Sequence, residues 1–320
     1  MCLYPKLIRN PKYKQNKKNG GVIPSVNDFR VLYVPIGWGE CIECRKKKAG
    51  QWVTRLLEEA REVNNGRFVT LTFSKEAFER LWKKYKVELI SLKGYELENE
   101  LVTLATREFL EKWRYKHGKS VKHWLITELG HNGTERIHLH GILWTDKLLE
   151  IERIWGNGYV YIGYSGLNEK TVNYITKYMT KMDFEHKNYK PKILCSKGIG
   201  AKYINRKDAE RNKYKKGETI ETYKDRTGVE RALPFYYKNK LVSEEDREML
   251  WIEKLDKLER YVLGVKVDIS TKKGEEVYKK LLKEAQRKNE RLGYGKGDKK
   301  WDEINYEEER REMLRDWEKK

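Results

Sequence analysis

Two histidines flank a single leucine in the stretch Ile137-His138-Leu139-His140, and this spacing favours metal binding. In an extended strand the side chains of residues i and i+2 point to the same face, so His138 and His140 can hold one ion together. Glu128 ends an earlier apolar stretch that a short hairpin would pair with the histidine strand, which makes it the natural third ligand. Two imidazoles and a carboxylate suit Mn²⁺ or Mg²⁺ and leave positions open for water and substrate oxygens.

Two tyrosines four positions apart, Tyr174 and Tyr178, come next in the chain. In a helix such residues are neighbours, so both hydroxyls can reach one point. Lys177 and Lys181 share their stripe of the helix and would stabilise a phenolate and bind phosphate oxygens. A separate apolar stripe consists of Val172, Ile175, Met179 and Met182. Because that stripe gives the helix a surface to pack on, we expect the tyrosines on a solvated face, available for chemistry.

Both motifs have a second interpretation. An H-x-H pair in a strand also occurs as two half-buried, hydrogen-bonded rings, and a stripe of Tyr and Lys also occurs as a plain nucleic-acid contact surface. Two further enzyme classes share H-x-H. Cupin-type oxygenases carry a Glu a few residues later, and H-x-H-x-D-H hydrolases need an Asp where Ile142 stands, so the sequence disfavours both.

The charge of the chain points to a polyanionic partner. The 320 residues include 69 Lys and Arg against 49 Asp and Glu, a formal charge of +20, together with 12% aromatic residues. This combination favours nucleic acid over a merely solubilising surface. The excess lies in the body of the chain, because residues 266–320 hold 17 basic and 14 acidic residues. No apolar run approaches the ~18 residues that span a bilayer, and no signal pattern opens the sequence, so we expect a cytosolic protein.

Four cysteines are too few for a disulfide framework in a chain of this length. Cys41 and Cys44 form a C-x-x-C pair just before an expected helix, and they could bind zinc together with Cys2 and one further ligand. A single C-x-x-C without a second pair is a weak indication of a zinc site.

The elements that must position these residues can be read from periodicity and turn signals. We expect helices at 49–63, 75–84, 101–116 and 147–155, strands at 68–73, 124–129, 136–144 and 159–163, and a helix that starts near Asn168. The strands at 124–129 and 136–144 form a hairpin through the loop 130–134. This order predicts an α+β fold with a mainly antiparallel central sheet of the split β-α-β type, ferredoxin- or RRM-like, flanked by helices.

Three segments are expected on composition. Residues 1–48 read as a basic N-terminal arm with the cysteine pair, residues 49–245 as the central domain, and residues 246–320 as a charged extension that is helical or partly disordered. A helix is expected at 243–262, and the last 55 residues alternate charges with few apolar positions.

In combination these motifs resemble the HUH endonucleases, specifically the rolling-circle replication initiators of gokushovirus-like microviruses, which are single-stranded DNA phages. The resemblance spans about residues 30–245. It rests on Phe68-Val69-Thr70-Leu71-Thr72-Phe73, Glu128, His138-Leu139-His140, Tyr174-x-x-Lys177-Tyr178, Cys41-x-x-Cys44-Arg45 with Gln51-Trp52, Gly198-Ile199-Gly200 and Leu233-Pro234-x-Tyr236-Tyr237. The chain departs from the pattern at Ile36, where such initiators often carry another cysteine, which argues against zinc at the cysteine pair.

The resemblance implies metal ligands at Glu128, His138 and His140 and nucleophiles at Tyr174 and Tyr178. It implies a nickase and strand transferase that acts on single-stranded or hairpin origin DNA in the host bacterial cytoplasm, with host helicase and polymerase as further partners. A two-tyrosine transposase or a relaxase would use the same chemistry. A non-catalytic nucleic-acid-binding protein, with structural histidines, is the alternative of a different class.

Overall fold

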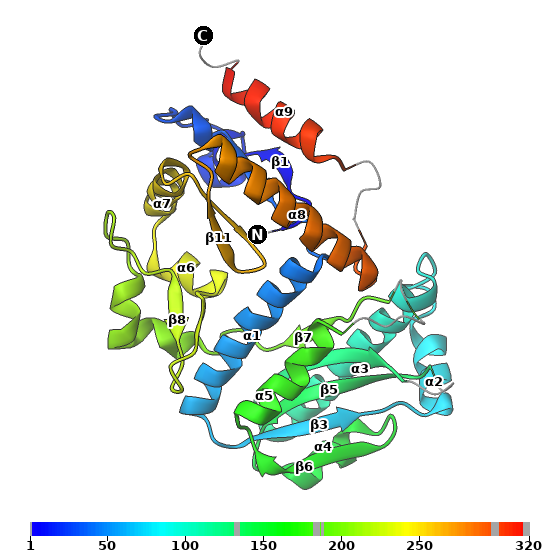
Figure 1. The fold of residues 1–320 in the computed structure, drawn as a ribbon. Helices are drawn as coiled ribbons and strands as arrows, with labels where there is room; N and C mark the ends of the chain where they lie inside the picture. The colour runs from blue at the N-terminus through cyan, green and yellow to red at the C-terminus, as the bar shows by residue number, and fades with distance from the viewer. Residues whose placement is uncertain (1, 131–134, 182–185, 187–188, 296–300, 316–320) are drawn as a thin grey trace. The chain divides into compact units, whose positions relative to one another are not determined.

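The computed structural model describes residues 2–130, 135–181, 186, 189–295 and 301–315, and the chain divides into two compact units. One unit comprises residues 51–203 and the other residues 1–50 together with 204–320 (Figure 1). This division differs from the boundaries expected at residues 48 and 245, because residues 204–245 make their contacts within the same unit as the N-terminal segment.

The unit 51–203 is built on a five-stranded sheet in which every pair of neighbouring strands is antiparallel, which confirms the predicted α+β class. The strand order is β6-β3-β5-β4-β7. The strands are β3 (Gly66–Leu71), β4 (Lys122–Leu129), β5 (Ile137–Trp144), β6 (Val160–Gly166) and β7 (Ile193–Cys195). Strands β4 and β5 form the expected hairpin, but the tip of its loop, residues 131–134, lies outside the described residues.

Helices flank both faces of this sheet. They are α1 (Ile42–Glu62), whose last part belongs to this unit, α2 (Lys75–Tyr85), α3 (Gly94–His117), α4 (Leu148–Trp155) and α5 (Glu169–Thr176), which continues as the 3₁₀ turn η4 (Lys177–Met179). Figure 1 shows α3 and α4 behind the sheet and α5 in front of it. Two helices begin seven residues earlier than expected, at Ile42 rather than Ala49 and at Gly94 rather than Leu101.

Alternation along the strands separates a core face from an open face. Leu139 and Leu143 of β5 point into a buried cluster with Phe109 of α3 and Trp155 of α4, and all four side chains are nearly inaccessible. The residues between them, His138, His140 and Ile142, therefore face the opposite side. The core thus fixes which face presents the histidines, since a slip of one residue would turn every side chain over.

Gly141 follows the second histidine because no side chain fits there. A Cβ at this position would lie 2.1 Å from the backbone oxygen of Trp124 and 2.8 Å from the Cα of Leu125 on β4. The close approach of β4 and β5 therefore requires glycine directly beside the histidine pair.

The second unit contains three separate two-stranded antiparallel sheets and four helices among its described residues. The sheets pair β1 (Lys6–Arg9) with β2 (Tyr33–Ile36), β8 (Thr222–Lys224) with β9 (Glu230–Ala232), and β10 (Glu259–Val262) with β11 (Val265–Asp268). The helices are α6 (Phe235–Leu241), α7 (Glu244–Asp256), α8 (Lys272–Arg291) and α9 (Glu303–Arg315). Short 3₁₀ turns are η1 (Pro11–Tyr13), η2 (Lys17–Asn19), η3 (Phe29–Val31), η5 (Ala201–Asn205) and η6 (Lys207–Asn212).

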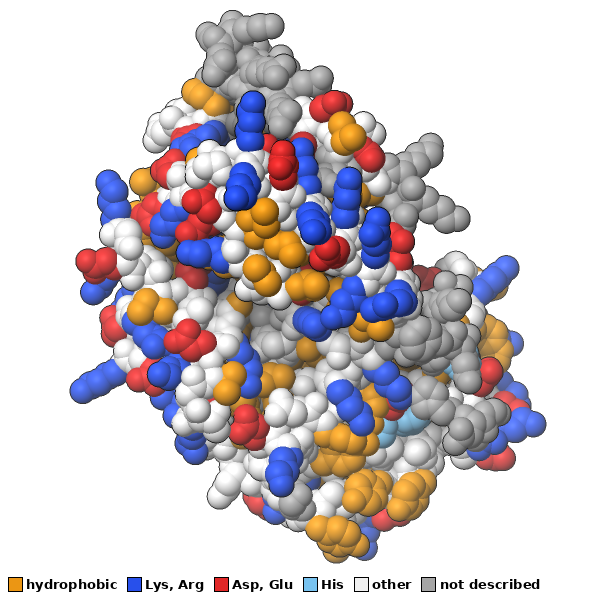
Figure 2. Space-filling model, in the orientation of Figure 1, with side chains coloured by type: hydrophobic (Ala, Val, Ile, Leu, Met, Phe, Trp, Pro, Cys, Tyr) orange, Lys and Arg blue, Asp and Glu red, His pale blue; other side chains and the backbone are white. Residues whose placement is uncertain are grey.

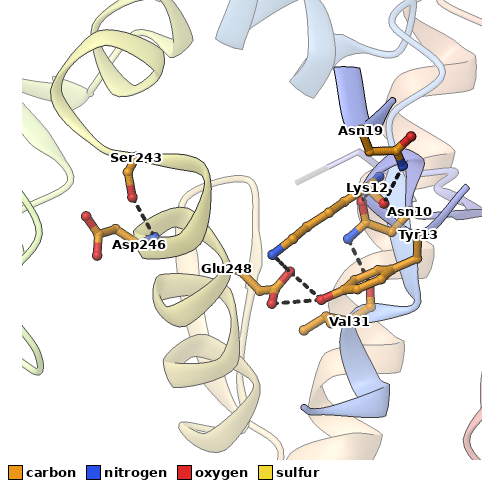
Figure 3. Close-up of polar contacts among 8 residues, drawn as sticks. All are labelled: Asn10, Lys12, Tyr13, Asn19, Val31, Ser243, Asp246 and Glu248. Atoms are coloured by element: carbon orange, nitrogen blue, oxygen red, sulfur yellow. Dashed lines mark hydrogen bonds and ion pairs between the residues drawn. The ribbon is translucent and has the colours of Figure 1, made fainter. Parts of the chain in front are cut away.

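The N-terminal segment is packed against this unit instead of forming a free arm. The buried Tyr13 donates its hydroxyl to both carboxylate oxygens of Glu248 on α7, each at 2.9 Å, and the Lys12 ammonium lies 3.1 Å from the same carboxylate (Figure 3). Asn10 donates its side-chain amide to the carbonyl of Val31 at 2.9 Å. The lysine-rich composition conceals these anchors, because the buried residues are scattered singly between exposed ones.

The C-terminal third corrects two expectations. The helix expected at 243–262 ends at Asp256, and a hairpin follows in which Leu258 and Leu263 both have a φ of +48°. Helix α8, expected to be solvated or disordered, buries Leu282, Ala285 and Asn289. A helix with one apolar stripe needs few apolar residues to pack, so the charge-rich composition of this segment is misleading.

Among the described residues, no helix combines the length and the apolarity that a membrane crossing requires.

Candidate active site

Strands β4 and β5 bring three potential metal ligands to one point. Glu128 lies directly opposite His138 in the antiparallel register, so both side chains leave the sheet on the same face. His140 follows on that face two residues later. The two Nε2 atoms lie 3.0 Å apart, and Oε2 of Glu128 lies 2.9 Å from Nε2 of His140 and 3.5 Å from Nε2 of His138.

The far side of each imidazole is held by a hydrogen bond. Nδ1 of His138 lies 3.1 Å from the carbonyl oxygen of Arg136, and Nδ1 of His140 lies 2.9 Å from the hydroxyl of Thr70 on β3. A carbonyl only accepts, so Nδ1 of His138 donates and the neutral ring keeps a lone pair on Nε2. The lone pair therefore points at the other ring and at the carboxylate of Glu128.

The electrostatics of this cluster favour a charged carboxylate and neutral rings. Burial alone would raise the pKa of Glu128, but hydrogen bonds from His138, His140 and Lys181 outweigh burial and hold that pKa well below its ordinary value. Burial lowers the pKa of His140, although the neighbouring carboxylate of Glu128 opposes this shift. Unprotonated imidazole and ionised carboxylate are the forms that bind metals.

The donor set fits a divalent cation. Two nitrogen ligands of one ion each lie ~2 Å from it, so adjacent ligands are roughly 3 Å apart, which is the spacing of the two Nε2 atoms. The groups behind the rings, a carbonyl and a hydroxyl, are those that commonly orient metal-binding histidines. The nitrogen and oxygen donors together suit Mn²⁺ or Mg²⁺.

Helix α5 and the turn η4 carry the two tyrosines over the same face of the sheet. Asn168 caps α5 by accepting a hydrogen bond from the backbone N–H of Thr171 at 3.0 Å, and Val172 and Ile175 anchor the helix as fully buried residues. The expected apolar stripe is confirmed for Val172, Ile175 and Met179, whereas Met182 lies outside the described residues. The helix tightens to a 3₁₀ turn at Lys177, before the second tyrosine.

The phenols meet each other and the histidines. The Tyr178 hydroxyl donates to the Tyr174 hydroxyl oxygen at 2.9 Å. The ring of Tyr178 stacks on the imidazole of His140, with centroids 4.7 Å apart and an interplanar angle of 11°. Phe68 of β3 stacks against His140 and meets Tyr174 edge-on at 5.7 Å. Both tyrosines are therefore adjacent to the donor cluster.

The two tyrosines differ in exposure, which corrects the expectation that both lie on a solvated face. Tyr174 is 45% exposed, but Tyr178 is only 6% exposed because its ring covers His140. Burial raises the pKa of Tyr178, and the hydrogen bond to Tyr174 and the charge of Glu128 raise it further. Tyr174 is thus the accessible phenol and Tyr178 the one that holds its proton more firmly.

Both lysines of the stripe lie at the site. The Lys177 ammonium is 3.9 Å from the ring centroid of Tyr174 and 5.2 Å from that of Tyr178. The Lys181 ammonium lies 2.7 Å from Oε1 of Glu128 and 5.7 Å from the Tyr178 centroid. In Figure 2, Lys and Arg side chains and a group of orange side chains, a class that includes Tyr, surround the pale blue histidine surface.

Three residues of this face were missing from the sequence-based site: Phe68, Thr70 and Tyr161. Thr70 pairs with His140 on one side and with Tyr161 of the edge strand β6 on the other, so the three side chains form a row across the sheet. Alternation in the β3 segment separates Phe68 and Thr70 from the core residues Val69 and Leu71. That signal assigns the face, but only the strand order shows that β3 lies beside the histidine strand.

Residues 66–183 match the model of a protein family described as Replication-associated protein ORF2. The matched stretch begins at the first residue of β3 and includes all seven candidate residues. No curated protein and no solved structure matches the chain. The family match is consistent with a rolling-circle replication initiator and suggests a role in the initiation of replication.

Proposed function

We propose that the protein starts rolling-circle replication by nicking single-stranded DNA with a tyrosine nucleophile. The observation that carries this proposal is the arrangement of two hydrogen-bonded phenols, 2.9 Å apart at their oxygens, directly against a His-His-Glu cluster. A structural pair of histidines or a plain DNA-contact stripe has no need for this convergence. The family match of residues 66–183 supports the same biological process.

In the proposed reaction the Tyr174 oxygen attacks the scissile phosphorus. A bond forms between that oxygen and phosphorus, the bond to the 3′ oxygen breaks, and the 3′ oxygen takes up a proton and leaves as a free hydroxyl. Lys177, next to the Tyr174 ring, stabilises the phenolate and binds phosphate oxygens. A divalent cation held by Glu128, His138 and His140 would polarise the phosphate and offset the charge that develops on its oxygens.

The product keeps the energy of the broken bond, because one phosphodiester is exchanged for another. The 5′ end stays on the tyrosine, and the 3′ hydroxyl is a primer for a host polymerase, with unwinding left to a host helicase. Tyr178 then cuts the regenerated origin, and the released 3′ hydroxyl attacks the first phosphotyrosine to close a circle. A second nucleophile on the adjacent turn allows both cuts without dissociation.

Exposed tyrosines on the same face support a single-stranded substrate. Tyr159 and Tyr161 of the β6 segment are 67% and 41% exposed, and Tyr161 is in line with Thr70 and His140 across the sheet. Residues i and i+2 of a strand share a face, so the two rings offer adjacent stacking surfaces for bases that lack a complementary strand.

The proposal is tested with labelled single-stranded oligonucleotides that tile the genome from which the chain derives. With Mn²⁺, one oligonucleotide should yield a protein-linked fragment, and mass spectrometry should place the adduct on Tyr174 or Tyr178. EDTA should abolish it. The Tyr174→Phe, Tyr178→Phe double variant should form no adduct, whereas Tyr115→Phe, which changes a tyrosine that is 96% exposed on α3, should react normally.

Two outcomes contradict the proposal. Nicking that persists in the double phenylalanine variant would exclude the tyrosine mechanism. Tight binding of the oligonucleotides without any nicking in Mn²⁺ or Mg²⁺ would favour the non-catalytic DNA-binding alternative.

A further inference from the structure

The unit formed by residues 1–50 and 204–320 contains a second cluster of metal-binding side chains, outside the candidate active site. Cys2, Cys41 and Cys44 place their three sulfur atoms within 4.8 Å of one another. The Sγ atoms of Cys2 and Cys41 are 3.8 Å apart, and those of Cys41 and Cys44 are 3.4 Å apart. All three cysteines are free of disulfide bonds.

We propose that Cys2, Cys41 and Cys44 bind a zinc ion through their three thiolates. Sulfur ligands lie ~2.3 Å from Zn²⁺, so two of them at tetrahedral angles are roughly 3.8 Å apart. The observed spacings of 3.4 and 3.8 Å are close to this value and far beyond the ~2.05 Å of a disulfide bond. Thiolate donors select zinc over the hard cations that suit the histidine cluster.

The surroundings of the sulfurs suit thiolates held in fixed positions. Cys44 lies in the first turn of α1 and Cys41 immediately precedes that helix, so both sulfurs are near its positive end. The backbone N–H of Tyr4 donates to Sγ of Cys2 at 3.4 Å. A Cβ on Gly37 would lie 3.2 Å from both the Cys2 Cβ and the Cys44 sulfur, so the backbone of β2's end closes tightly over the cluster.

The site is completed by solvent. Among the described residues, no further His, Cys, Asp or Glu places a ligand atom in the cluster. Cys41 is fully buried, but Cys2 and Cys44 are only partly buried, which gives water access to the fourth position. Each thiol loses its proton as the metal binds.

The position of the cluster gives the ion a structural role. Cys2 is near the start of the chain, and the cluster links it to the beginning of α1, 39 residues later. The three cysteines pack with Leu3, Ile42 and the buried face of α8 in one small apolar core. A unit with only two-stranded sheets has little core to hold it together, so a metal that joins two distant segments would stabilise it considerably.

Metal content tests the site. The full chain carrying His138→Ala and His140→Ala, which disables the other donor cluster, is loaded with Zn²⁺, desalted and analysed by elemental mass spectrometry. We expect one tightly held zinc per chain. Adding Cys44→Ser should remove it, whereas adding Cys195→Ser, a change to an exposed thiol outside the cluster, should leave it in place. Unchanged zinc content in the Cys44→Ser protein would overturn the proposal.

Thiol protection in the unmodified chain gives an independent readout, which does not depend on a variant that folds poorly. Zinc should slow the alkylation of Cys2, Cys41 and Cys44 at least tenfold and leave the rate at Cys195 unchanged, as measured by peptide mass spectrometry. Equal rates with and without zinc, or a disulfide within the cluster of the zinc-loaded protein, would overturn the proposal.

Discussion

At the scale of single residues, the hydroxyl of Thr70 is the group most specific to the proposed metal site. It lies 2.9 Å from Nδ1 of His140 and so fixes the ring with Nε2 toward Glu128. Thr70→Val keeps the shape of the side chain and removes this contact. Loss of such a group typically lowers metal affinity about 10- to 100-fold. Isothermal titration with Mn²⁺ measures the effect.

Thr72→Val is the matched control for that change. The Thr72 hydroxyl donates to the backbone oxygen of Tyr159 at 3.0 Å and contacts no imidazole, so Mn²⁺ affinity should not change. Equal affinities for the two variants would show that Thr70 does not orient His140.

The pH dependence of metal binding follows from the environment of His140. Burial, opposed by Glu128, lowers the pKa of this ring, so it stays neutral to below the ordinary imidazole value of about 6.5. The protonated ring cannot bind metal. Mn²⁺ affinity should therefore be constant through neutral pH and fall only under more acidic conditions, as titrations at a series of pH values would show. An affinity that already falls between pH 8 and 7, in a buffer without metal affinity, would contradict this assignment.

At the scale of elements, strand β6 is expected to contact DNA bases. Replacing Tyr159 and Tyr161 by alanine removes two exposed rings next to the site. Each stacked base contributes about 1–3 kcal/mol, so the affinity for a single-stranded oligonucleotide should fall at least tenfold in fluorescence anisotropy. The Tyr115→Ala variant removes an equally exposed ring on α3 and should bind normally. Unchanged binding by the double variant would exclude β6 as a base-stacking surface.

The elements that sequence reasoning predicted are those with a local signal. Alternation over 124–129 and 136–144 and the helical stripe after Asn168 correspond to β4, β5 and α5. The β10–β11 hairpin was missed, because its turn depends on Leu258 and Leu263 in a backbone conformation that leucine rarely adopts. The buried face of α8 was missed because its partners, among them Leu3 and Ile42, are more than two hundred residues away in sequence.

The candidate site shows the same limit. Its seven residues were named from the spacing of residue types, which sequence displays directly. Thr70 and Phe68 were not, since their contact with His140 depends on β3 lying next to β5 in the sheet. The burial of Tyr178 was not predicted either, because it results from stacking on a ring from a different element.

At the scale of the whole molecule, charge should dominate DNA affinity. Of the excess of basic residues, residues 51–203 hold 26 Lys and Arg against 19 Asp and Glu, and residues 1–50 hold 11 against 3. Each phosphate contact on a single strand contributes a slope of about −0.7 to a plot of log affinity against log salt concentration. We expect a slope of about −3 or steeper for oligo(dT), measured by anisotropy across a series of NaCl concentrations.

A peptide nucleic acid of the same sequence is the control, because it has bases but no phosphates. Its binding should be weak and nearly independent of salt. A flat salt response for the DNA itself would show that the positive charge serves solubility and does not contact the strand.

A single proton joins the phenol oxygens of Tyr174 and Tyr178, and in the proposed reaction this makes the two cuts consecutive. While Tyr174 is unmodified, its oxygen engages the Tyr178 hydroxyl and stabilises its own anionic form at the expense of its neighbour's. Esterification by DNA ends that role, because an ester oxygen is a poor acceptor, and Tyr178 is released for the next attack. The enzyme would thus sense its own covalent intermediate, with no moving part larger than one hydroxyl rotor.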